Sequence, residues 1–244
     1  MNNLTQRLVT TLIVSLTMIG LVLCRNTLVL FLFLVAGHLE FLWMLHHGNK
    51  LSNRDCLILA VGFVGWYLKA PYIGFVILAN DLWSVLLYFS GCIIWTYPSY
   101  LISVSYVQQN PTFYIIAGTA IFLTDGGAYF GGKFLGKTKL SEVSPNKTWE
   151  GTISGILTTV IFMFLISTVD YQLLRVDWLI LGLIYGVFGQ LGDLFESGFK
   201  RWVNVKDSGF LLPGMGGIND RCDSMYLALP VGHLYLLLRG YSLR

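Results

Sequence analysis

Charged side chains are scarce in this sequence, and their scarcity excludes an ordinary water-soluble domain. Asp, Glu, Lys and Arg make up 12% of the 244 residues, whereas hydrophobic residues make up 55%. Soluble domains carry roughly 25% charged residues. The formal net charge is only +3, so the chain also lacks the strong positive charge that favours a nucleic-acid partner. We expect most of the chain to face lipid or other apolar helices.

Paired metal-ligand spacings are absent as well. The four cysteines and four histidines include no Cys-x-x-Cys pair and no His spacing typical of a metal site. The cysteines therefore favour neither a zinc site nor a disulfide framework, and we interpret them as apolar residues. Any metal chemistry has to come from carboxylates.

Long hydrophobic runs are what the sequence does contain. A membrane-spanning helix needs roughly 20 apolar residues. The runs lie at about 8–23, 27–45, 55–79, 82–107, 112–130, 151–169, 176–195 and 224–238. They predict an all-α, polytopic transmembrane helical bundle of about eight or nine spans. We interpret 1–244 as a single integral membrane domain, with apolar N-terminal spans in 1–110 and a catalytic half in 111–244.

The charges that are present gather in two predicted loops, at about 131–150 and 196–223. Two apolar runs separate these loops, so both are expected on the same side of the membrane. Both are rich in Lys and Arg, which places that side in the cytoplasm. Polar residues interrupt the apolar stretch between 55 and 130. Depending on whether these residues are taken to separate spans, the stretch crosses the membrane an even or an odd number of times. The side of the N-terminus therefore stays open.

The segment from Asp193 to Asp223 carries the strongest chemical pattern. Asp193 follows one apolar run, and Asp220 and Asp223 precede another. Residues three apart share a helix face, so Asp220 and Asp223 can address one site. An acid at mid-bilayer costs roughly 2.5 kcal/mol or more, which usually implies a partner or a function. Carboxylates of this kind are typical Mg²⁺ ligands beside substrate phosphates.

Cations and glycines lie close to these acids in the sequence. Arg binds phosphate with two hydrogen bonds and Lys acts as a point charge, so basic residues beside metal-binding acids favour a polyphosphate substrate. Glycines can let a backbone cradle an anion, although such a loop alone is a weak signal. The plainer interpretation is a solvated loop with surface ion pairs, but a linker has no need of acids beside two apolar runs. The cations are Lys200, Arg201, Lys206 and Arg221.

A second polar segment lies upstream, between Asp125 and Gly151. Asp125 follows a long apolar run, and Ser144-Pro145 can start a helix at Asn146 or shortly after. Lys147 would then lie at the positive end of that helix, where it suits a phosphate. The alternative is a simple turn and helix start.

The segment Ser197–Asp223 resembles the sequence pattern of phosphatidate cytidylyltransferases, also called CDP-diglyceride synthetases. The upstream stretch is similar to that family's Asp-x-Gly-Ala-Tyr and Ser-Pro-x-Lys-Thr-Trp-Glu-Gly blocks. The chain departs from the family at Met215, where His is usual, and at Gly126, where Thr is usual. The matching residues of the longer pattern are Ser197, Phe199, Lys200, Arg201, Lys206, Asp207, Gly209, Leu212, Pro213, Gly216, Gly217, Asp220, Arg221 and Asp223.

The resemblance implies a reaction of CTP with phosphatidic acid that gives CDP-diacylglycerol and pyrophosphate, at the cytoplasmic side of a bacterial inner membrane. It implies one or two Mg²⁺ ions, with Asp193 and Asp220 as ligands assisted by Asp223. Lys200 and Arg201 would act in catalysis. The substrate-binding residues would be Asp125, Lys147, Ser197, Lys206, Asp207 and Arg221. The lipid bilayer would hold the acyl tails, and a homodimer stays open.

Three other functions fit a polytopic chain with acids in its helices. A secondary transporter would have acids near helix midpoints and a repeated half, and no repeat is visible. A CDP-alcohol phosphotransferase would need an Ala-Arg pair after Asp-Gly, which is absent here. A related cytidylyltransferase acting on another lipid phosphate stays open.

Overall fold

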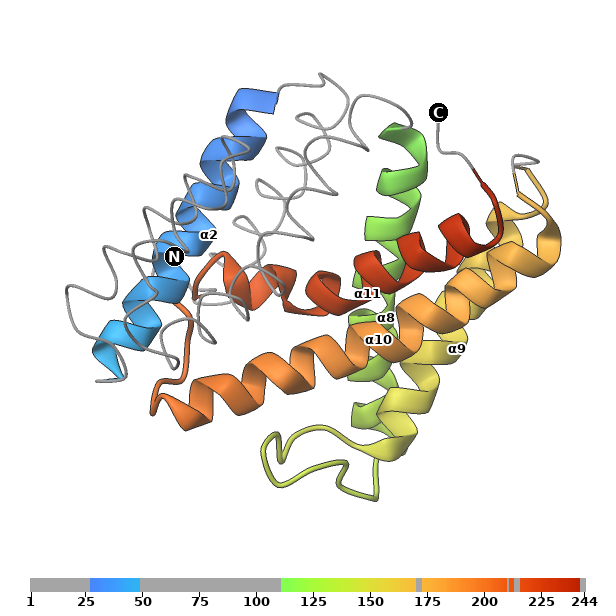
Figure 1. Cartoon of the computed structure of the whole chain (residues 1–244). Coiled ribbons are helices and arrows are strands. Elements are labelled where there is room, and N and C mark those ends of the chain that lie inside the picture. Colours follow the sequence, from blue (N-terminus) through green and yellow to red (C-terminus); the bar gives the residue numbers. More distant parts are fainter. Residues whose placement is uncertain (1–26, 49–110, 170–172, 210, 213–215, 242–244) are drawn as a thin grey trace, which may run out of the picture. The chain divides into compact units, whose positions relative to one another are not determined.

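A computed structural model of the chain describes residues 27–48, 111–169, 173–209, 211–212 and 216–241 (Figure 1). Side chains are described from residue 36 and, after 111, from residue 112. These residues form helices and no strands, with two isolated β-bridges at Lys139–Thr148 and Leu212–Gly216. The described part of the chain is therefore all-α, as predicted. The helices are α2 (Thr27–His47), α8 (Pro111–Leu135), α9 (Trp149–Ile166), α10 (Arg175–Trp202) and α11 (Asn219–Leu238).

The chain divides into two compact units. The first unit comprises 1–108 and 199–221, and the second comprises 109–198 and 222–244. Helices α10 and α11 each begin in one unit and end in the other. Each unit is considered by itself below, and the predicted single domain stays a prediction.

Three of the helices are long and apolar enough to cross a membrane: Thr112–Leu135, Trp149–Ile166 and Arg175–Trp202. They coincide with predicted runs at 112–130, 151–169 and 176–195. The runs at 8–23, 55–79 and 82–107 lie outside the described residues, so the count of eight or nine spans stays a prediction.

The predicted loop boundaries were wrong. Helix α8 continues to Leu135, α10 continues to Trp202, and α11 begins at Asn219. The predicted loops at 131–150 and 196–223 are therefore partly helical. Backbone hydrogen bonding does not stop where hydrophobicity stops, because a helix can continue as a polar extension of an apolar span. Asp125 and Asp193 consequently lie within helices rather than at helix ends, and only Asp220 and Asp223 lie near one.

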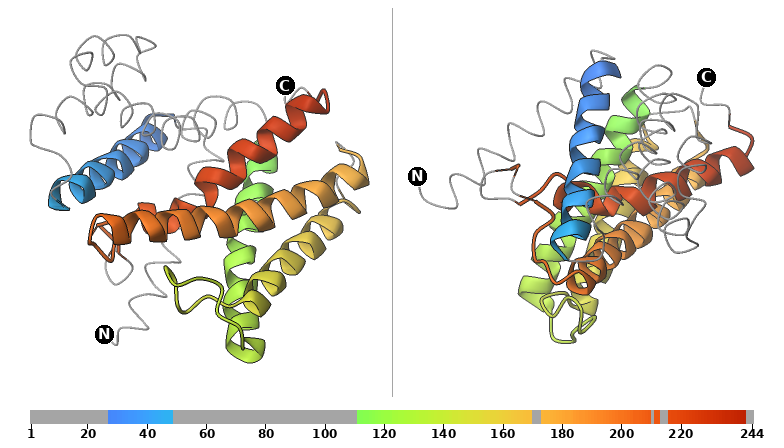
Figure 2. Two further views of the ribbon diagram at one scale, coloured as in Figure 1. Left: turned by 60° about the horizontal axis from the view of Figure 1, so that its bottom comes forward. Right: turned by 60° about the vertical axis from the view of Figure 1, so that its left-hand side comes forward.

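Small residues bring α8 and α9 into close contact in the second unit, as both views in Figure 2 show. A Cβ atom on Gly155 would lie 2.5 Å from the carbonyl oxygen of Thr124, and one on Gly151 would lie 2.7 Å from that of Ala128. The hydroxyls of Thr124 and Thr159 hydrogen-bond between the helices. Such small-residue packing is typical of membrane helices. It fixes the part of α8 that carries Asp125.

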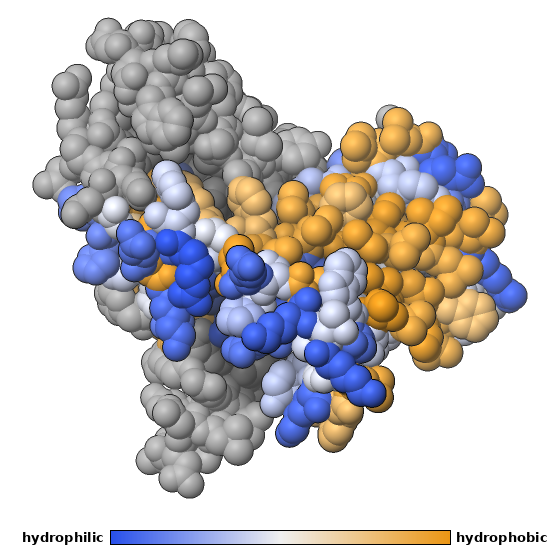
Figure 3. Space-filling model, turned by 90° about the horizontal axis from the view of Figure 1, so that it is seen from below, coloured by the Kyte–Doolittle hydropathy of each residue, from blue (hydrophilic) through white to orange (hydrophobic). Residues whose placement is uncertain are grey.

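Large apolar side chains cover the outer face of α9. Ile153, Leu157 and Ile161 are each more than half exposed, whereas Gly155 and Thr159 on the opposite face are buried. On the face drawn in Figure 3, hydrophobic residues gather over one broad area, with hydrophilic residues beside it. A helix with its apolar side outward is suited to lipid rather than to water, which supports an integral membrane protein.

A buried acid ties the start of α10 to the end of α11 within the second unit. Asp177 is 0% exposed, and Arg239 donates to it from Nε at 2.9 Å. The hydroxyls of Tyr235 and Tyr241 also donate to Asp177. A buried carboxylate held by several donors keeps its neighbours in a fixed arrangement. These contacts secure the helix pair at the end distant from Asp193.

Candidate active site

Four carboxylates from three helices gather in the second unit. Asp125 comes from α8, Asp193 and Glu196 come from α10, and Asp223 comes from α11. The first three lie near enough to Asp223 to act on its charge. Asp223 is 9% exposed and Glu196 is 5% exposed. Because like charges repel strongly where water is excluded, such a group favours binding of a cation.

Ser224 connects two of these acids. Its hydroxyl donates to Asp125 at 3.2 Å from Oδ2, and its backbone N–H donates to Oδ1 of Asp223 at 2.7 Å. Ser224 is itself 2% exposed. Ser224 was not among the predicted site residues, although its position directly after the motif's last Asp was a signal that could have found it.

Gly192 allows α10 to approach α11 closely. A Cβ atom at this position would lie 2.5 Å from the backbone oxygen of Asp223. Any other residue would therefore push the two helices apart. The glycine sets Asp193, its neighbour in the chain, near Asp223.

Lys147 links the upstream motif to the downstream one. Its Nζ lies 2.6 Å from Oδ2 of Asp193, and Ser197 Oγ donates to Oδ1 of the same aspartate at 3.3 Å. Thr148 caps helix α9 and accepts from the N–H of Gly151 at 3.2 Å. The helix therefore begins at Trp149, three residues after the earliest predicted start. Lys147 directly precedes the cap.

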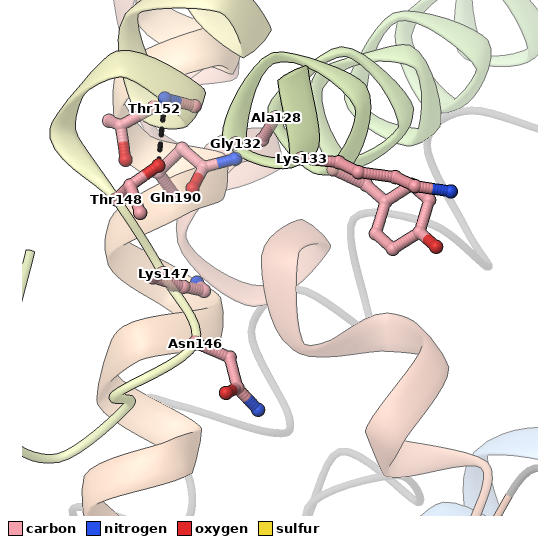
Figure 4. A pocket seen from close by; sticks show the side chains of 10 residues that line it. Ala128, Gly132, Lys133, Asn146, Lys147, Thr148, Thr152 and Gln190 are labelled. Carbon is pink, nitrogen blue, oxygen red and sulfur yellow. Dashed lines mark hydrogen bonds between the residues drawn. The ribbon is translucent and has the colours of Figure 1, made fainter. Parts of the chain in front are cut away.

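A pocket of about 440 Å³ lies beside this ion pair (Figure 4). It is formed by the C-terminal part of α8, the start of α9 and one residue of α10. Two lysines and several neutral polar groups interrupt a largely apolar lining, as is typical of small-molecule sites. The polar lining residues are Lys133, Asn146, Lys147, Thr148, Thr152 and Gln190.

The departure at Gly126 is not imposed by packing. A Cβ atom there would meet nothing within 4 Å, so a side chain can start at this position without a clash. Met215, the other departure, lies outside the described residues.

The first unit holds a different kind of acid. Lys200 Nζ lies 2.6 Å from Oδ1 of Asp220. The backbone N–H groups of Ser208 and Gly217 donate to Oδ2 at 2.9 and 2.8 Å. Burial alone would raise the pKa of Asp220, but Lys200 and these two amides outweigh it and hold that pKa below its ordinary value. Asp220 is therefore an ionised group that fixes Ser208 and Gly217 onto the start of α11.

Glu40 supports the same loop and was not selected from the sequence. The N–H of Asn219 donates to Glu40 Oε2 at 3.1 Å, and the Asn219 amide donates to the carbonyl of Gly37 at 2.8 Å. A Cβ atom on Gly217 would lie 2.5 Å from Glu40 Oε2. Gly216 has a φ of 87°, which few other residues adopt. A lone acid in a predicted span was the available signal.

The other predicted site residues of the first unit have exposed side chains. These residues are Arg201, Lys206, Asp207 and Arg221. Exposed cations suit recognition of a charged group that arrives from water.

The acids of the second unit are the kind of ligand that Mg²⁺ prefers, but they do not form a complete coordination shell. Within the described residues, no three His, Cys, Asp or Glu side chains converge closely enough to hold a metal ion. Mg²⁺ usually takes one or two carboxylates and completes its shell with water and substrate phosphates. The gathered carboxylates are of the type that this ion takes as ligands.

Comparison with known proteins identifies relatives of the chain. The sequence profile of the cytidylyltransferase family matches residues 5–239. The phosphatidate cytidylyltransferase of Staphylococcus saprophyticus is 46% identical over 125 residues, which cover 50% of this chain and 48% of the relative. The enzyme of that name from Staphylococcus aureus is 50% identical over 121 residues, covering 48% and 46%. That of Bacillus subtilis is 46% identical over 137 residues, covering 55% and 50%. The chain thus matches about half the length of these relatives.

Proposed function

Because the chain belongs to the cytidylyltransferase family, we propose that it transfers CMP from CTP to phosphatidic acid, giving CDP-diacylglycerol and pyrophosphate for phospholipid synthesis. The observation that carries this proposal is the meeting of two distant motif segments. Lys147 pairs with Asp193, and Ser224 bonds Asp125. Acidic side chains and Lys147, a cation of the kind that binds phosphate, thereby lie together beside the pocket.

The chemistry asks mainly for positioning and charge neutralisation. A phosphate oxygen of phosphatidic acid attacks the α-phosphorus of CTP in line, and pyrophosphate leaves. The phosphate is already an anionic nucleophile, so no covalent enzyme intermediate is needed. Holding the two anions in line supplies much of the rate, and fixed positive groups stabilise the charge that develops.

Each predicted residue has a proposed role in this reaction. Lys147 binds a phosphate group of the substrate, and Asp125 and Ser197 hold the surroundings of Asp193 and Asp223 in place. Lys200, Arg201, Lys206 and Arg221 attract and bind triphosphate or lipid phosphate, with Asp207 in the same loop. Mg²⁺, as one or two ions on Asp193, Asp223 and Asp220, would neutralise phosphate charge. Of these three acids, Asp223 fits the ion best. Lys200 and two amides already engage both oxygens of Asp220. Lys147 and Ser197 contact both oxygens of Asp193, so Lys147 would have to turn toward the substrate for Asp193 to bind the ion.

The surroundings of the reaction follow from the same proposal. The chain crosses the membrane eight or nine times, with the segments 131–150 and 196–223 on the cytoplasmic side of a bacterial inner membrane. The apolar outer faces of the helices keep the acyl tails of the substrate in the bilayer. A homodimer is compatible with this arrangement. Family membership favours an enzyme over a transporter.

A second lipid phosphate is the remaining alternative. The proposed phosphate and metal contacts would be the same for every lipid phosphate. The substrate tails therefore have to be tested directly.

The test is an assay of the purified full chain with CTP, Mg²⁺ and phosphatidic acid, measuring pyrophosphate and the CDP-lipid. We expect both products in equal amounts, and Asp193→Asn should lower the rate by at least about 100-fold, because it removes a proposed metal ligand. Thr119→Val is a matched control on α8, since its exposed hydroxyl bonds only the carbonyl of its own helix at Ile115 within the described residues. Absence of products with every lipid phosphate tried would overturn the proposal.

A further inference from the structure

Gln190 is a largely buried residue that lines the pocket and that the reaction as described leaves unused. It lies on α10, three residues before Asp193, and is 5% exposed. In Figure 4 it lies between Gly132 and Thr148, which line the same pocket. Within the described residues its side chain makes no hydrogen bond. Because this largely enclosed residue lines the pocket, its amide is available to pair with a molecule bound there.

The chemistry of an amide restricts what that ligand can be. A Gln side chain offers two N–H donors and a carbonyl acceptor at the same end. A phosphate group only accepts hydrogen bonds at neutral pH, so it would leave the carbonyl of Gln190 unsatisfied. Lysine is the side chain suited to phosphate, and Lys133 and Lys147 already line this pocket.

A nucleoside satisfies both halves of the amide. Cytosine presents an N4 amino donor next to the N3 and O2 acceptors, so one Gln can pair with it through two hydrogen bonds. Ribose hydroxyls also donate and accept. A pocket of about 440 Å³ is within the range that holds small molecules of this size.

From these observations we propose that Gln190 binds the nucleoside part of the nucleotide, with the amide paired to the cytosine edge. The lysines of the same pocket then face the phosphates. This assignment rests on the proposed function for the identity of the nucleotide. It adds a binding residue that lies outside both motif segments. Because an amide can rotate by half a turn, Gln190 secures a pyrimidine without by itself distinguishing cytosine from uracil.

The test compares Gln190→Met with the wild-type chain, since Met has a similar length and no strong hydrogen-bonding group. We expect the KM and the Kd for CTP to rise about 10- to 100-fold, which is the value of one paired base contact. The KM for phosphatidic acid and the rate at saturating CTP should stay within about twofold. Gln190→Asn retracts the same amide by one methylene group and should give an intermediate loss.

Inhibition by pyrophosphate separates a nucleoside contact from a phosphate contact. If Gln190 binds the nucleoside, pyrophosphate should inhibit Gln190→Met and wild type at the same concentration. If Gln190→Met weakened the binding of pyrophosphate and of CTP equally, Gln190 would contact the phosphates and the assignment would be overturned. Unchanged CTP binding in both variants, with a Tm equal to that of Thr119→Val, would also overturn it. Because CTP binding is measured apart from turnover, a wild-type chain that binds CTP without product formation would count against the proposed reaction alone.

Discussion

Two aspartates lie within one turn at the start of α11, and the structure surrounds them differently. Asp220 has a lysine on one oxygen and two backbone amides on the other. Asp223 has a serine as its neighbour and three further carboxylates near it. The first aspartate is neutralised within the protein, and the second lies in an excess of negative charge. The comparison teaches that an acid's partners, rather than its place in a motif, decide whether it can hold an ion.

The largest effect should come from Asp223→Asn. This change keeps the hydrogen bond from Ser224 but removes the negative charge proposed to hold Mg²⁺. We expect CDP-lipid formation to fall by at least about 100-fold, because metal stabilisation of phosphate charge is worth several kcal/mol. The Tm should not fall, because the change relieves repulsion with Asp125, Asp193 and Glu196. Normal activity together with a lowered Tm would mean that Asp223 stabilises the fold and does not hold Mg²⁺.

Asp220→Ala should act mainly on stability. It leaves Lys200, a largely buried cation, without its carboxylate and frees two backbone amides. Breaking a buried ion pair from one side typically costs about 3–5 kcal/mol, measured as the loss in free energy of unfolding. Lys200→Met should cost a similar amount, and the double variant should cost less than the sum.

The same pair of variants can break the comparison. If Asp220→Ala unfolds at the wild-type temperature but needs far more Mg²⁺ for activity, Asp220 is a metal ligand like Asp223. Additive losses in the double variant would mean that Lys200 and Asp220 act independently.

Ser224→Ala should have the smallest effect of the three. Ser224 holds Asp125 and Asp223 together but is not proposed to touch substrate. Loss of such a supporting hydrogen bond typically lowers metal affinity or activity about 10- to 100-fold. We expect the lower end of that range, seen as a higher Mg²⁺ concentration for half-maximal rate. Ser224→Thr keeps the hydroxyl and should recover most of the activity, whereas an equal loss in both variants would indicate a packing role.

The sequence predicted the helices well and their ends poorly. Runs of apolar residues located α8, α9 and α10, because a long hydrophobic segment has few alternatives to a helix in a bilayer. The ends were wrong because charged residues such as Lys200 extend a helix without adding hydrophobicity. Prediction of Asp125, Lys147 and Asp193 as one group relied on the resemblance, and the structure does bring these residues together in the second unit.

The residues that the sequence did not reveal are those whose importance depends on a neighbour. Ser224 and Glu40 gave only weak signals in the sequence, and Gln190 gave none. Ser224 matters because its hydroxyl reaches Asp125, a residue of another helix. Glu40 matters because the backbone of Asn219 donates to it.

By itself, the sequence determined that the chain is helical and apolar. It also determined that the chain carries acidic and basic residues of the kinds found in enzymes that transfer phosphate groups. Composition and periodicity carry that information locally, residue by residue. Only the tertiary structure decided which acid is paired with a lysine and which lies among other acids. That difference depends on distances between residues far apart in the chain, since electrostatic and hydrogen-bond energies depend on separation in space.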